Sequence, residues 1–178
     1  MRPLPPLSPR MALSRRVVTA VHTVRTRRYA AAFLDALLAL TIALAPAVPF
    51  PGVLKGRVFG FGLVAGTAYL LFRDGIPYAE WGARSLGKRW LGVRPYRVTG
   101  EPMDWRVSAR RNATVAAAFG IPAVAYVLGG YRGFPFDRFV LAAALLLVAV
   151  EAVLAGVDAE GARLGDRWAD TRVTEARA

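Results

Sequence analysis

The sequence predicts an all-α fold, namely a polytopic membrane protein built as a bundle of four transmembrane helices with a cytoplasmic loop between the second and the third. Two features of the 178-residue chain carry this prediction: it contains four long apolar stretches, and nearly all of its arginines lie between or outside them. The stretches are Tyr29–Val48, Val58–Phe72, Ala113–Leu128 and Phe139–Val157.

The length of each stretch decides whether it can cross a bilayer. A helix rises about 1.5 Å per residue and the hydrocarbon core is roughly 30 Å thick, so about 20 apolar residues span it. The first and the last stretch meet this requirement. The second and the third meet it only when their flanks are included.

The chain is both apolar and strongly basic, with 55% hydrophobic residues and a net charge of +12. A basic excess of this size can indicate nucleic-acid binding, which spreads positive charge over a folded surface. Here the apolar runs are too long for soluble core helices. We therefore expect a lipid bilayer, and no nucleic acid, as the partner of this chain.

The positions of the basic residues predict the topology. Residues 1–28 carry seven, residues 73–111 nine and the tail from residue 158 four, which makes 20 of the 24 Lys and Arg. The other four lie in residues 49–57 and 129–138. Because loops rich in Lys and Arg stay in the cytoplasm, we expect a multi-pass protein of the cell inner (cytoplasmic) membrane with both termini cytoplasmic.

The first apolar stretch is expected to be a retained helix. A basic segment precedes it and Ala45-Pro46-Ala47 resembles a signal-peptide cleavage site. However, the basic segment is long, and Asp35 interrupts what would be the apolar part of a signal peptide. We therefore assign residues 1–27 to a basic, partly disordered N-terminal segment, and expect the helix after it to end at the prolines that follow Leu44.

The second apolar stretch is rich in glycine. Gly56 with Gly60, and Gly62 with Gly66, have the spacing that lets two helices approach closely in lipid. The neighbour can be a helix of the same chain or of another copy, and a homo-oligomer formed through this helix is one expectation. Pro122 predicts a kink in the third stretch. We see no convincing internal repeat between the two halves of the chain.

Several kinds of chemistry lack the residues that they require. The chain has no cysteine, so it has no thiolate metal site. It has one histidine, so a Ser-His-Asp arrangement or a histidine metal site would depend on that single imidazole. We expect no cofactor, no metal site and no enzymatic activity.

Two carboxylates lie within the apolar stretches, Asp35 in the first and Glu151 in the fourth. An ionised Asp at the centre of a bilayer costs about 2.5–3.5 kcal/mol on insertion scales, so each carboxylate needs a partner. Arg28 lies too far along the helix axis for direct contact with Asp35 unless its side chain reaches inward, and Arg110 or Arg111 are the other candidates. Either these carboxylates form a cation or proton site between helices, or they hold the helices together.

Three segments of the sequence resemble the RDD family of bacterial membrane proteins, which is named for one arginine and two aspartates. Arg28 to Asp35 matches the opening of the family, Ser85 to Arg94 its loop motif, and Gly165 to Val173 its closing motif. The resemblance covers residues 28–173 and leaves 174–178 as a tail. Gly165 departs from the pattern, because many relatives have His before the aspartate.

The resemblance implies a set of site residues. We expect a charge network at the inner mouth of the bundle, with Asp35 and Asp166 as the anions and Arg28, Lys88 and Arg111 as cations. Transport of unidentified ligands is proposed for the family, and sodium/proton antiport for some members. Two hypotheses follow for this chain: transport of cations or protons by an oligomer through Asp35 and Glu151, or a non-transporting scaffold or accessory subunit whose charge network is structural.

Overall fold

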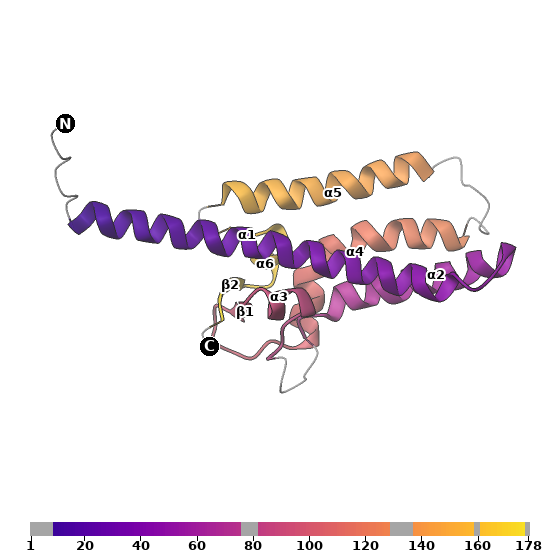
Figure 1. Cartoon of the computed structure of the whole chain (residues 1–178), viewed down its shortest axis with the longest axis horizontal. Coiled ribbons are helices and arrows are strands. Elements are labelled where there is room, and N and C mark those ends of the chain that lie inside the picture. The colour runs from indigo at the N-terminus through magenta and orange to yellow at the C-terminus, as the bar shows by residue number, and fades with distance from the viewer. Residues whose placement is uncertain (1–8, 76–81, 129–136, 159–160, 177–178) are drawn as a thin grey trace.

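The computed structural model describes residues 9–75, 82–128, 137–158 and 161–176. Four long helices dominate it (Figure 1). They are α1 (Pro9–Leu44), α2 (Gly52–Phe72), α4 (Trp105–Leu128) and α5 (Asp137–Val157). The basic segment from Pro9 onward is the N-terminal part of α1, which runs without a break into the first apolar stretch and ends in a 3-10 turn at Ala45–Ala47. α4 continues across Pro122 as one helix.

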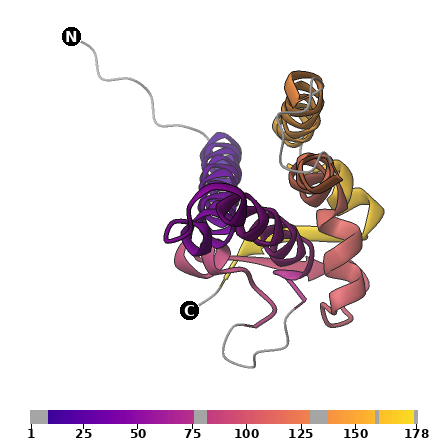
Figure 2. The ribbon, with the colours of Figure 1, turned by 90° about the vertical axis from the view of Figure 1, so that its right-hand side faces the viewer.

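Two of the described helices are long and apolar enough to cross a membrane, Val24–Ala47 and Trp105–Leu128, while the apolar helix Ala142–Val157 is shorter. α2 lies between α1 and α4, and α5 packs on α4. The last residues of α1 and α4 and the first residues of α2 and α5 lie at one end of the bundle, to the right in Figure 1, and Figure 2 looks onto that end. The two helical hairpins, α1 with α2 and α4 with α5, therefore point in the same direction.

Short elements gather at the opposite end of the long helices (Figure 1). They are α3 (Leu86–Trp90), β1 (Val93–Arg97), α6 (Leu164–Trp168) and β2 (Thr171–Glu175). The two strands pair antiparallel, although the sequence analysis expects helices alone. Each strand has five residues and its partner lies far away in the chain, so the sequence carries no hairpin signal for them.

Close glycine contacts hold α2 against α1. A Cβ at Gly62 would lie 2.5 Å from the carbonyl oxygen of Ala43, and one at Gly66 would lie 2.7 Å from that of Ala39. These two glycines therefore serve packing within the chain. A homo-oligomer through α2 remains a prediction and has to use the other side of this helix.

A short motif occurs twice in the described part of the chain, although the sequence alone shows no convincing repeat between the halves. The residues of α3 read Leu-Gly-Lys-Arg-Trp, and those of α6, 78 positions later, read Leu-Gly-Asp-Arg-Trp. Both short helices end in the same way: Leu91 (φ −96°, ψ 8°) matches Ala169 (φ −103°, ψ 5°). The next residue is left-handed in both, with φ +64° at Gly92 and +48° at Asp170.

The repeat extends to the packing and the pairing of these elements. Gly87 of α3 packs on the backbone of Ala31 in α1, and Gly165 of α6 packs on the backbone of Arg111 in α4. Pro95 pairs with Val173, which is its own counterpart 78 positions later. The chain is therefore two consecutive units, each with two long helices, a short helix and a strand. Four shared residues are too short a signal to reveal this in the sequence.

We predict that Gly62→Ala lowers the stability of the protein in detergent by about 1–3 kcal/mol, because the added methyl group must displace the α1 backbone. Gly156→Ala is the matched control, since its Cβ would meet nothing closer than the Tyr29 hydroxyl at 3.6 Å. Thermal unfolding of the two variants measures the difference. Equal melting temperatures would contradict this packing of α1 on α2.

The strand register predicts a specific cross-link. The chain has no cysteine, and Arg94 lies opposite Thr174. We expect Arg94→Cys with Thr174→Cys to form a disulfide under mild oxidation, because directly opposed Cβ atoms lie about 4.5–5.5 Å apart. Arg94→Cys with Arg172→Cys is displaced by two residues and should cross-link much less. Efficient cross-linking of the displaced pair alone, measured by proteolysis and mass spectrometry, would refute the register.

Candidate functional site: a buried charge network

Three aspartates are fully buried in the described part of the chain, and they lie on different elements. Asp35 is on α1, Asp74 follows the end of α2, and Asp166 is on α6. The cations around them are buried as well: Arg28, Arg73, Lys88 and Arg111. A buried charge is costly unless it is paired and hydrogen-bonded, so the partners of each carboxylate decide what the site can do.

Asp35 is surrounded by donors from α2, α3 and the segments beside them. Its carboxylate accepts hydrogen bonds from the Tyr69 hydroxyl (3.0 Å), the Ser85 hydroxyl (2.6 Å) and the Gly87 amide (3.0 Å). The Arg73 guanidinium lies 3.0 Å away and forms an ion pair. Asp35 thus attaches the N-terminal end of α3 to the first helix.

The ion-pair partner of Asp35 is therefore Arg73, and neither Arg110 nor Arg111 takes this place. Arg28 pairs with Asp166 instead. Its distance from Asp35 along α1 is too great for a direct contact between these two residues.

Asp74 is the second anion of the network. It pairs with the Lys88 ammonium at 2.6 Å and with the Arg111 guanidinium at 3.0 Å, and it accepts a hydrogen bond from the Asn112 amide at 3.2 Å. Its own backbone N–H donates to the Ser108 hydroxyl at 3.1 Å. Burial alone raises the pKa of Asp74, but the charges of Lys88 and Arg111 outweigh it and hold that pKa well below its usual value. This carboxyl is therefore ionised.

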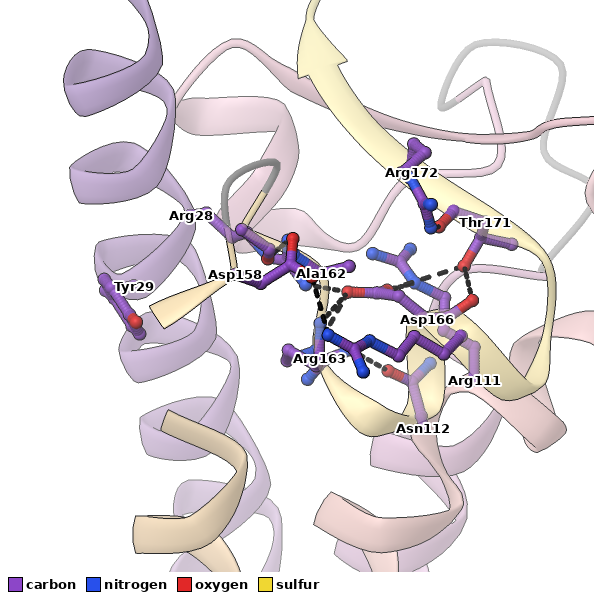
Figure 3. A network of polar contacts seen from close by, with 12 residues as sticks. Arg28, Tyr29, Arg111, Asn112, Asp158, Ala162, Arg163, Asp166, Thr171 and Arg172 are labelled. Atoms are coloured by element: carbon purple, nitrogen blue, oxygen red, sulfur yellow. Dashed lines mark hydrogen bonds and ion pairs between the residues drawn. The ribbon is translucent and has the colours of Figure 1, made fainter. Parts of the chain in front are cut away.

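Asp166 is the third anion, and Figure 3 shows the contacts around it. It pairs with Arg28 and, at 2.7 Å, with the Nε of Arg111. It also accepts hydrogen bonds from the Arg163 backbone N–H (3.0 Å) and the Thr171 hydroxyl (3.4 Å). Burial, followed by the charges of Arg111 and Arg73, lowers the pKa of Arg163 to about 10, so this neighbour stays charged at neutral pH.

Arg111 joins two of these anions. Its Nη1 binds Asp74 while its Nε binds Asp166, and the side chain is completely buried. Gly165 lies directly against the Arg111 carbonyl oxygen, where any Cβ would overlap it. The position at which many relatives carry His therefore has no room for a side chain here.

Glu151 differs from the three aspartates. It is 3% exposed, and neither carboxylate oxygen has a hydrogen-bond partner in the described part of the chain. Its charge acts on Arg28 and Arg163, so it lies beside the network without a direct contact to it. Within the described ranges, Glu151 and Asp35 have no hydrogen-bond or ion-pair partner in common.

Two central members, Arg73 and Asp74, are absent from the sequence prediction. They follow the second apolar stretch directly, at the beginning of the predicted cytoplasmic loop. An Arg-Asp pair directly after an apolar stretch is the signal that could identify them. Among the described residues, no group of three or more His, Cys, Asp or Glu side chains is arranged to hold a metal ion.

A mostly helical chain with apolar helices of spanning length, and with polar segments clamped to one end of them by buried ion pairs, has the form of an integral membrane protein. The chain matches the family model described as RDD family over residues 23–170. It therefore belongs to the RDD family, whose members are membrane proteins. No curated protein and no solved structure matches the chain.

The network predicts unequal effects of substitution. Asp74→Asn leaves both Lys88 and Arg111 without their shared anion, so we expect a loss of about 3–5 kcal/mol in the free energy of unfolding. Lys88→Met should cost less, because Arg111 still neutralises Asp74. The exposed Glu101→Gln is the control and should change stability by less than about 0.5 kcal/mol. Denaturation in detergent that ranked Lys88→Met as the more harmful change would contradict this assignment.

Proposed function

We propose that the chain is a four-crossing protein of the inner membrane with both termini in the cytoplasm. The charge distribution supports this topology, since 20 of 24 basic residues fall on the side that carries both termini. The common direction of the two hairpins supports it too (Figure 1). In this orientation the charge network lies at the cytoplasmic end of the bundle.

The network acts as a structural clasp in this proposal, and the protein acts as a non-transporting membrane scaffold or accessory subunit. The observation that carries the proposal is the saturation of Asp35. Four groups of the same chain surround its carboxylate, including the Arg73 guanidinium. A carboxylate that must bind and release a cation needs free oxygen positions, and a permanent guanidinium partner competes with any cation for them.

The other two aspartates support the same function. Asp74 and Asp166 are also paired with cations on other elements, so all three carboxylates connect segments that are distant in the chain. The loop after α2 and the C-terminal segment are thereby held against α1 and α4. A rigid cytoplasmic face of this kind suits the docking of other proteins.

Glu151 favours a second candidate function, the transport of cations or protons. Its buried carboxylate has no hydrogen-bond partner in the described part of the chain, whereas the Asp35 carboxylate has three. The parallel repeat also fits, because many transporters consist of two repeated units with their sites between them. Transport would require Glu151 to be the working carboxylate, with Asp35 in a supporting role.

Flux measurements in proteoliposomes separate the two functions. The clasp predicts that the wild-type protein passes neither Na⁺, K⁺ nor H⁺ above the level of empty liposomes, and that Asp35→Asn lowers the melting temperature because Arg73 loses its anion. Glu151→Gln should leave the melting temperature nearly unchanged. Wild-type flux that Glu151→Gln abolishes while the fold stays intact would replace the clasp with the transport function.

A further inference from the structure

Three of the four tryptophans lie in the described part of the chain, and all three are exposed. Trp90 is 74% exposed, Trp105 57% and Trp168 52%. Each has an arginine as its neighbour in sequence: Arg89, Arg106 and Arg167. We call these three pairs the Arg–Trp belt. Exposed indole rings in a polar segment need an explanation, because burial of a tryptophan is strongly favourable.

The depth of the short helices relates the belt to the membrane surface. Gly87 packs α3 against Ala31, which is seven residues inside the apolar helix Val24–Ala47. Seven residues correspond to about 10 Å along a helix. α3 is therefore level with the first turns of the apolar helix, and Trp90 at its end lies at the boundary between polar and apolar surroundings.

The second short helix, α6, lies at a similar depth along its long helix. Gly165 packs α6 on Arg111, close to the start of the apolar helix Trp105–Leu128. Trp168 is the counterpart of Trp90, so both short helices present an exposed Arg–Trp pair after the same packed glycine. Trp105 begins the apolar helix itself and lies at the same boundary.

The side chains of the belt have the chemistry of a headgroup contact. Indole rings prefer the headgroup region, where the ring is half in lipid and its N–H reaches polar groups. Arginine binds phosphate with several N–H donors. The Arg106 guanidinium lies over the Trp105 ring at 5.2 Å, so cation and ring are presented together. Arg167 also pairs with Asp158 at 2.7 Å, and its side chain is 55% exposed.

We propose that the Arg–Trp belt binds the headgroups of anionic phospholipids in the cytoplasmic leaflet, with the indole rings at the boundary and the arginines on the phosphates. This inference rests on the proposed topology, because that topology brings the belt to the negatively charged leaflet. The belt would fix the depth of the bundle in the membrane and hold α3 and α6 parallel to its surface.

Tryptophan fluorescence in nanodiscs tests the proposal. Variants of the full chain keep one tryptophan each (Trp90, Trp105 or Trp168) and carry Phe at the other three positions. Each is measured in discs whose phosphatidylglycerol, or whose phosphatidylcholine, carries bromine near the headgroup end of the acyl chains. We expect each tryptophan to be quenched in both, and about twofold more strongly by the brominated anionic lipid. Arg→Gln at the neighbouring residue should remove this preference and retain the quenching.

The controls separate a failure of the proposed belt from a failure of the proposed topology. Arg57→Gln removes an exposed arginine near the opposite end of α2 and should leave the lipid preference unchanged. Phe61→Trp, made as the single tryptophan, reports on a site in the middle of α2 that is 74% exposed, and it is measured in discs whose lipid carries bromine near the methyl ends of the acyl chains. Quenching at position 61 without quenching of the three belt tryptophans would overturn the belt alone. Absence of quenching at position 61 as well would overturn the topology. Equal quenching by both lipids would overturn the preference for anionic headgroups.

Discussion

The fold depends on the ion pairs of Arg111. Its guanidinium is completely buried and binds one carboxylate that follows α2 and another on α6, so it connects the two halves of the chain at one point. Removing charges from water is expensive, and the cost is offset only when every charge in the cluster has partners in good geometry. Asp74 and Asp166 meet this condition because Lys88 and Arg28 supply the second cation to each.

The internal repeat explains how such a cluster is assembled. The same short helix occurs twice, and each copy packs a glycine on the backbone of a long helix. The next residue carries opposite charges in the two copies, lysine at position 88 and aspartate at position 166. Both charges belong to one cluster, because Lys88 pairs with Asp74 and Arg111 links Asp74 to Asp166. A strictly identical repeat would place two like charges there and would be destabilised.

The saturation of the carboxylates separates the structural from the functional interpretation. Asp35, Asp74 and Asp166 have the surroundings of residues that hold a fold together, since each accepts from several donors on other elements. Glu151 has the same burial and no hydrogen bond in the described part of the chain. Burial of an acidic residue in an apolar helix is therefore an insufficient guide to transport. The number of donors around the carboxylate distinguishes the two roles.

The sequence by itself determined the class of protein and most members of the network. Apolar lengths and arginine positions indicate a membrane protein, and the motifs identify Arg28, Lys88 and Arg111 among the cations. Only the tertiary structure decided which charged residues form ion pairs and which segments pair as strands. Arg73 and Asp74 fall in the predicted cytoplasmic loop, and the sequence predicts helices alone where the two strands form, because the partners of these segments lie 14 or more residues away. Periodicity and hydropathy are local properties, whereas ion pairing and strand pairing depend on contacts that form only when distant segments meet.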